Sequence, residues 1–177
     1  MRYSWLLGCC LVLLASGCRT DDDETSFDAR EGRMTATINR VAFAATDIRA
    51  DFLDDGSVHF LLTGSDYSLP TGRRLGIEVH APGPDYPRAG TYGTATFCRL
   101  RVVDCWFANY THRIGSDSSS ISYVALPDNE PQLDLHYYES SFGTVARGSF
   151  AFACGPTGSD TASFFVTDGT FEVLVNE

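Results

Sequence analysis

The sequence contains no lysine, so all 13 of its basic residues are arginines, and they are outnumbered by 23 acidic residues. The formal net charge of −10 predicts an acidic surface, which repels nucleic-acid phosphate and anionic lipid headgroups. Nucleic acid is therefore set aside as a partner. The lack of lysine itself is better explained by genome composition than by function.

Motifs of enzymes and metal sites are also missing. The chain has no Gly-x-Ser-x-Gly elbow, no phosphate-binding loop, no His-Glu-x-x-His and no Cys-x2-Cys zinc spacing. Its histidines, His59, His80, His112 and His136, are scattered. His59, His80 and His136 lie in alternating strand patterns, where a histidine is more often an outward or satisfied residue than a ligand. Turn and surface roles explain its acid pairs better than glycoside hydrolysis does. We therefore expect no enzyme, no metal and no cofactor.

The N-terminal segment has the pattern of a bacterial lipoprotein signal. An apolar run from Trp5 to Ala15, about eleven residues, suits a signal peptide but is too short to cross a bilayer, which needs roughly 20. Small residues then lead from Ala15 to Cys18, a spacing that resembles the lipobox in which the cysteine thiol carries diacylglycerol. We predict a signal peptide over residues 1–17 and lipidation of Cys18. The alternative is ordinary secretory cleavage that leaves Cys18 unmodified.

Residues 18–32 are expected to form a flexible acidic tether. The run Asp21 to Glu24 and the scarcity of apolar residues disfavour ordering, and about 14 residues reach about 20 Å. The acidic run after the lipidated cysteine resembles the export signal of surface-displayed lipoproteins in the Bacteroidota. That resemblance implies a membrane anchor through the lipid, with the protein on the outer membrane at the cell surface. A lipoprotein that faces the periplasm is the alternative.

Residues 33–177 are long enough for one domain with a proper core. No helix of convincing length is predicted; short alternating or β-rich runs are separated by Gly, Pro, Asn and Asp. Such spacing indicates an all-β antiparallel sandwich or flattened barrel of about 8–10 strands. The expected strand runs are 34–45, 47–52, 58–63, 75–81, 91–97, 106–112, 121–125, 132–138, 145–154 and 162–175, the last folded on itself.

Two turns and one aromatic face follow from local sequence. Asp54-Asp55-Gly56 and Asp168-Gly169 each place glycine where a tight hairpin needs positive φ. We therefore expect residues 164–167 and 170–175 to pair as a terminal hairpin, with the odd-numbered residues Phe171 to Val175 on one face. Phe150 and Phe152 likewise share an inward face, and burying each ring contributes roughly 1.5–3 kcal/mol.

The order of several short motifs resembles a known family. Asn39, Phe43 and Ala45 are followed by Gly90-Thr91-Tyr92, and later by the runs 148–152 and 166–171. This succession is similar to a family of small, uncharacterised Bacteroidota lipoproteins, although Arg40 stands where the family usually has glycine and Phe43 where it has tryptophan. The resemblance covers most of residues 33–175. It implies a fold and a cellular localisation but no activity, because no activity is established for the family.

Three cysteines remain after Cys9, Cys10 and Cys18 are assigned to the signal and the lipid. They face an oxidising compartment, and three thiols allow three single pairings. A hairpin loop between Cys98 and Cys105 would bring these two opposite each other, and closing that ring is worth about 2.5 kcal/mol. We favour this disulfide, with Cys154 as a buried apolar residue. Pairing of Cys154 with either of the others is the competitor.

Candidate ligand contacts are aromatic. Trp106, Tyr110, Tyr137 and Tyr138 could stack on sugars or anchor a protein partner if their rings are exposed; the alternative is that they pack the core. Neighbouring tyrosines in a strand face opposite ways, so one of Tyr137 and Tyr138 should point outward. Asp160-Thr161-Ala162 resembles the O-glycosylation motif of Bacteroidota exported proteins, which makes Thr161 a possible glycan site.

The function that follows is a lipid-anchored, non-catalytic module that binds glycan or protein. Two alternatives stay open. One is a structural or accessory envelope lipoprotein that partners another membrane component. The other is a small-ligand carrier, which a roomy apolar interior would favour.

Overall fold

Strands make up nearly all of the regular structure in the part of the chain that the structure describes. The computed structural model describes residues 32–54, 58–68, 72–81, 87–96, 98, 105–113 and 120–176. The predicted signal peptide, Cys18 and nearly all of the acidic tether lie outside these residues. Within the described part, no helix has the length and apolar character needed to cross a membrane.

Eleven strands and two short 3-10 turns make up the described elements. The strands are β1 (Arg33–Ile38), β2 (Val41–Ala44), β3 (Asp47–Asp54), β4 (Val58–Asp66), β5 (Arg73–His80), β6 (Gly90–Tyr92), β7 (Cys105–Arg113), β8 (Ser120–Ala125), β9 (Gln132–Ser140), β10 (Gly143–Pro156) and β11 (Phe164–Asn176). The 3-10 turns are Thr94–Thr96 and Pro127–Asn129. The all-β prediction is confirmed, with a strand count slightly above the expected 8–10.

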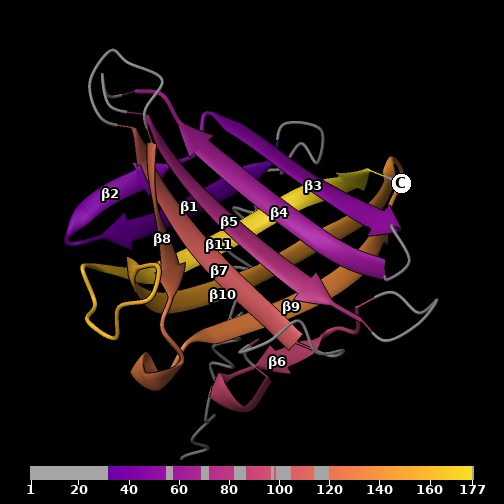
Figure 1. Cartoon of the computed structure of the whole chain (residues 1–177). Helices are drawn as coiled ribbons and strands as arrows, with labels where there is room; N and C mark the ends of the chain where they lie inside the picture. Colours follow the sequence, from indigo (N-terminus) through magenta and orange to yellow (C-terminus); the bar gives the residue numbers. More distant parts are fainter. Residues whose placement is uncertain are drawn as a thin grey trace, which may run out of the picture.

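The strands form one sheet that bends into two layers. The front layer in Figure 1 has the order β3-β4-β5-β7-β8, and the back layer has the order β2-β1-β11-β10-β9-β6. The layers are joined at both sides. The end of β11 pairs in parallel with β3 through Val175 and Ala50, and the end of β10 pairs antiparallel with β8 through Cys154 and Ala125. The result is a flattened barrel, as the sequence predicts.

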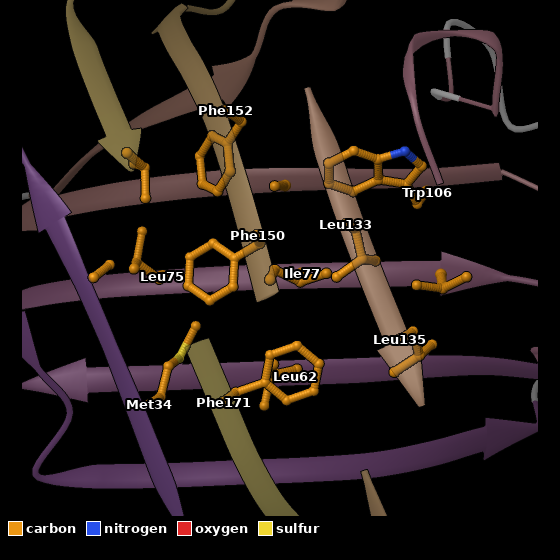
Figure 2. Close-up of a cluster of buried hydrophobic side chains, with 14 of the residues drawn as sticks. Met34, Leu62, Leu75, Ile77, Trp106, Leu133, Leu135, Phe150, Phe152 and Phe171 are labelled. Atoms are coloured by element: carbon orange, nitrogen blue, oxygen red, sulfur yellow. The ribbon is translucent and has the colours of Figure 1, made fainter. Parts of the chain in front are cut away.

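The core lies between the two layers and follows from alternation along the strands. In β5, Leu75, Ile77 and Val79 are fully buried. Glu78 and His80 occupy alternate positions and point to the outer face. Phe150 and Phe152 of β10 are both 3 % exposed, which confirms their predicted inward face. Figure 2 shows how rings and aliphatic chains from both layers meet: Met34, Leu62, Leu75, Ile77, Trp106, Leu133, Leu135, Phe150, Phe152 and Phe171.

The run 34–45, predicted as one strand, is a hairpin. Asn39 and Arg40 adopt φ values of 48° and 68°, and Ile38 pairs with Val41 across the turn. Positive φ at both central residues defines the two-residue turn whose twist matches a β-ribbon. The sequence hides this turn because arginine stands at the second position, where glycine is the usual signal.

The prediction of a terminal hairpin at Asp168-Gly169 is wrong. β11 runs unbroken through these residues, and they form a β-bulge: Val166 lies opposite Phe152, and Gly169 lies opposite Phe150. Asp168 has φ of 52°, so the positive φ that the sequence suggests is present but serves a bulge rather than a turn. A Cβ on Gly169 would lie 2.4 Å from the Phe150 ring, which explains the glycine.

The predicted disulfide between Cys98 and Cys105 is confirmed, with a Cα–Cα distance of 5.0 Å. The backbone N–H of Cys98 donates to the carbonyl oxygen of Trp106 at 2.9 Å, which holds the segment against the start of β7. Cys154 is a free, buried thiol, as expected. Burial raises its pKa to about 12, so it remains protonated and unreactive at neutral pH.

One ion pair is buried at the edge of the core. Asp66 of β4 and Arg73 of β5 are directly paired, only 1 % and 7 % exposed, and joined by a salt bridge. Arg73 also donates to the carbonyl oxygen of Ala42 at 2.8 Å and lies 5.5 Å from the centre of the Phe43 ring, so it ties β2 to the front layer. Burial alone would raise the pKa of Asp66, but hydrogen bonds from Ser68 and the charge of Arg73 outweigh it and lower that pKa.

Candidate functional site

The outer face of the back layer carries a polar groove. Side chains in β11 alternate between the two faces of the sheet: Phe171 and Val173 point inward, and Thr170 and Glu172 point outward. Outward residues of β1, β9 and β10 complete the hollow, which has a volume of about 340 Å³ and is open to solvent. Its lining consists of Arg33, Asp134, His136, Arg147, Gly148, Ser149, Thr170, Phe171 and Glu172.

A row of charged side chains crosses four strands along one side of this groove. Cross-strand register places Arg33 and Arg147 on either side of Glu172, and His136 next to Arg147. An Arg33 guanidinium nitrogen lies 3.9 Å from a Glu172 carboxylate oxygen. The second Glu172 oxygen accepts a hydrogen bond of 2.8 Å from the hydroxyl of Tyr138. Glu172 is therefore the centre of the row and holds the tyrosine in place.

The ring of Tyr138 is fixed from two directions. Its hydroxyl is held by Glu172, and the guanidinium carbon of Arg147 lies 5.4 Å from its ring centre. This distance allows a cation–π contact, which contributes about 0.5–1 kcal/mol at an exposed site. A tyrosine that is held by both its hydroxyl and its ring has few rotamers left to lose when a ligand contacts it.

A row of hydroxyl groups forms the other side. Asp134 accepts hydrogen bonds from Thr91 at 2.6 Å and from Ser149 at 3.3 Å, and Thr170 lies opposite Ser149 in the register. The hollow follows from side-chain length, because Ser149, Thr170 and Gly148 are short and the arginines beside them are long. A Cβ on Gly148 would lie 1.9 Å from the backbone oxygen of Asp134, so this position has to be glycine.

Chemically, the groove offers several kinds of contact within a small area. Its lining has guanidinium donors, carboxylate acceptors and hydroxyl groups that do both. The aromatic ring of Tyr138 adjoins this lining, where Glu172 and Arg147 hold it. This is the set that recognises a molecule rich in hydroxyl groups, since each hydroxyl can donate and accept. Charge-assisted bonds from arginine and carboxylate are the stronger members of the set.

The two neighbouring tyrosines face opposite ways, as predicted. Tyr138 points outward at the groove, whereas Tyr137 points into the core, where its ring lies 5.8 Å from that of Phe52 and 6.1 Å from that of Phe60. The Tyr137 hydroxyl is buried with no hydrogen-bond partner among the described residues. Burial raises the pKa of Tyr137, so it stays neutral.

The expectation that Trp106 and Tyr110 offer rings to a ligand is corrected by their burial. Their side chains are 0 % and 2 % exposed, because the register of β7 turns both toward the core. The Trp106 indole N–H donates to the carbonyl oxygen of Gly93 at 3.2 Å. Tyr110 packs against Phe164 with ring centres 4.8 Å apart. Both belong to the packed interior, the alternative that the sequence left open.

Thr161 is exposed and follows the turn that begins at Pro156, the last residue of β10. Its backbone N–H donates to the hydroxyl of Ser159 at 3.1 Å, and its side chain is accessible. Modification of Thr161 stays a prediction, and so does lipidation of Cys18, which lies outside the described residues.

The structure also brings together two histidines that the sequence analysis treats as scattered. His59 of β4 lies directly opposite His80 of β5, and with Glu78 they form a cluster of possible metal ligands on the outer face of the front layer. His112 and His136 lie elsewhere, on β7 and β9. Alternation could have shown that Glu78 and His80 share a face, but the pairing of β4 with β5 is needed to add His59.

Most groove residues were likewise missed, because they come from strands far apart in the chain. The sequence names His136 only as a histidine without a ligand role, and Tyr138, which adjoins the lining through Glu172 and Arg147, as a candidate contact. The sequence did contain one signal: the polar residues Arg147 and Ser149 stand at alternate positions just before Phe150. This pattern indicates an outer face of one strand, but it does not show which strands lie beside it. No family model, curated protein or solved structure matches this chain, so its function has to be inferred from this geometry.

Proposed function

We propose that this protein is a lipid-anchored envelope protein whose sandwich domain is a non-catalytic module that binds glycan in the groove of the back layer. The observation that carries the proposal is the arrangement of Tyr138, Glu172 and Arg147. An aromatic ring is held in place beside a charged pair that can hydrogen-bond to hydroxyl groups.

Sugar rings present one apolar face and a rim of hydroxyl groups. A tyrosine ring suits the apolar face, and the amphipathic character of tyrosine makes it a common contact residue. The rim suits the hydroxyl row of Ser149 and Thr170 and the carboxylate of Asp134. The shallow, open form of the groove favours part of a long or branched glycan over a small molecule that has to be enclosed.

The packed interior is the reason to prefer surface contact over transport of a small ligand. The side chains in Figure 2 come from both layers, are buried and belong to one hydrophobic core cluster. Support for the carrier alternative would need an apolar cavity there. The accessory-lipoprotein alternative differs in the identity of the partner rather than in the anchor, so a binding experiment separates the two.

The anchor is supported by the sequence from Leu14 to Cys18. Arg33, the first residue of β1, lines the groove, so the tether enters the domain beside the proposed binding surface. We place the protein on the outer membrane at the cell surface, with a periplasm-facing lipoprotein as the alternative. Incorporation of a fatty-acid analogue by wild type but not by Cys18→Ser tests the anchor.

Glycan binding is tested with a glycan array followed by titration of the best ligand. Wild type is expected to bind at least one glycan class, and Tyr138→Ala is expected to weaken that binding about 2- to 12-fold, since an aromatic contact is worth about 0.5–1.5 kcal/mol. The matched control is Tyr67→Ala, because Tyr67 is 62 % exposed and directly follows β4 of the front layer. Absence of binding, or equal loss in both variants, would refute the proposal.

A further inference from the structure

Three potential metal ligands meet on the outer face of the front layer, on the opposite side of the molecule from the groove. Glu78 and His80 lie two residues apart in β5, so their side chains leave the same face of the strand. His59 of β4 lies directly opposite His80 in the antiparallel register. Cross-strand side chains in such a pair are close neighbours, so the fold itself brings the three together.

The ligand atoms are already close to one another. The Nε2 atom of His80 lies 2.8 Å from a carboxylate oxygen of Glu78, and the imidazole ring centres of His59 and His80 are 4.9 Å apart. One ligand atom from each residue can be chosen so that all three lie within 4.8 Å of one another. Tetrahedral zinc with bonds of 2.0–2.2 Å needs its ligand atoms about 3.3–3.6 Å apart, a change that side-chain rotation can supply.

The surroundings favour a stable site. His59 is only 7 % exposed, and the side chains of His80 and Glu78 are 15 % and 23 % exposed, so all three are shielded from bulk solvent. The Phe107 ring stacks on His80 with centres 6.0 Å apart, which restricts the imidazole. The disulfide at Cys105 fixes the residue directly opposite His80 on the other neighbouring strand.

Electrostatics point the same way. A divalent cation between these residues would be stabilised by the imidazole nitrogen lone pairs and by the Glu78 carboxylate. Two imidazoles and one carboxylate are also a donor set found in zinc sites that keep a fourth position open. Imidazole nitrogen favours Zn²⁺ and its neighbours in the transition series over Mg²⁺ or Ca²⁺, which prefer oxygen ligands alone.

The geometry points to a divalent transition-metal site in which His59, Glu78 and His80 bind one Zn²⁺ and water occupies the fourth position. This site lies on strands β4 and β5 and shares no residue with the groove. It is therefore independent of the glycan-binding proposal.

The experiment uses the purified protein without a histidine tag, stripped with EDTA and kept free of reductant so that the disulfide stays closed. Zinc chloride is titrated against a chromophoric chelator. Wild type is expected to take up one equivalent of zinc, and an excess of EDTA is expected to remove it again.

Three variants locate the site. His80→Gln and Glu78→Gln are each expected to weaken zinc binding by at least about 100-fold, since even substitutions around a ligand cost 10–100-fold. His112→Gln, on β7 of the same layer, is the matched control and should bind zinc as wild type does. Absence of saturable uptake by wild type, or unchanged affinity in both site variants, would overturn the proposal.

A spectroscopic measurement covers the case in which a variant fails to fold. Cobalt chloride is added to the wild-type protein, and the visible absorption of Co²⁺ reports its geometry. Intense bands of a four-coordinate ion support the site, whereas the weak spectrum of hexaaqua cobalt contradicts it. Circular dichroism of each variant, compared with wild type, shows whether a loss of zinc affinity arises from unfolding.

Discussion

The buried ion pair of Asp66 and Arg73 makes a quantitative prediction about stability. Asp66→Asn keeps the size of the side chain but removes its charge, which leaves the Arg73 guanidinium uncompensated at 7 % exposure. Removing one partner of a buried pair costs about 3–5 kcal/mol. Arg73 keeps its bond to the Ala42 carbonyl and its contact with Phe43, so we expect a loss near 3 kcal/mol.

A loss of this size is easy to measure. For a domain of this length it corresponds to a fall in melting temperature of roughly 6–12 °C. Urea unfolding can be followed by the fluorescence of Trp106, which is fully buried in the folded state. Asp160→Asn makes the same chemical change at an exposed loop position and should alter the free energy of unfolding by less than about 0.5 kcal/mol.

The pH dependence gives a second test of the same pair. The pKa of Asp66 is lower in the folded protein than in the unfolded chain, so its charged form stabilises the fold. That contribution is fully present above the unfolded pKa of about 3.9 and is lost as the pH falls through the folded value. The difference in stability between wild type and Asp66→Asn should therefore shrink below about pH 4.

A double variant separates the pair from its context. Asp66→Leu combined with Arg73→Met replaces both charges by apolar groups, and such replacements are often neutral or stabilising. We expect the double variant to be more stable than Asp66→Asn alone. Equal urea midpoints for wild type and Asp66→Asn, or a difference that persists unchanged at pH 3, would refute the reasoning.

Two further predictions concern the backbone. Arg40→Gly should raise the free energy of unfolding by about 0.5–1 kcal/mol, because a φ of 68° costs a residue with a Cβ about 1–2 kcal/mol and glycine avoids part of that cost. Asn39→Gly is the control and should not be stabilising, since it loses the side-chain hydrogen bonds to the backbone of Ser163 and Phe165. Replacing Cys98 and Cys105 together by serine should lower the free energy of unfolding by about 2.5 kcal/mol. Urea midpoints check both, and an Arg40→Gly protein no more stable than wild type would contradict the first.

Much of the fold was predictable because alternation is a local property. Leu75, Ile77 and Val79 show their inward face in the sequence itself, and so do Phe150 and Phe152. The errors arose where one local signal serves two structures. Positive φ at Asp168 suits a turn or a bulge equally well, and only the partners of β11 on both sides decide between them.

The candidate sites were harder to predict because each requires strand pairing. The sequence could show that Tyr137 and Tyr138 face opposite ways, but not that Glu172, 34 residues later, would hold Tyr138. Likewise, His59 and His80 are 21 residues apart, and their contact depends on the register of β4 and β5. Trp106 shows the converse: a large aromatic ring at a strand start suggests a binding residue until the register assigns it to the core.

The position of β11 in the sheet has a consequence for when folding can finish. β11 pairs with β1 and β10 and also with β3 at its very end, where the Asn176 side-chain amide donates to the carbonyl oxygen of Ala50 at 3.2 Å. A polypeptide that emerges N-terminus first, from a ribosome or a translocation channel, lacks the central member of one layer until β11 has been released. The earlier strands remain unpaired on that side until then, and a truncation that removes β11 should abolish folding rather than shorten the domain.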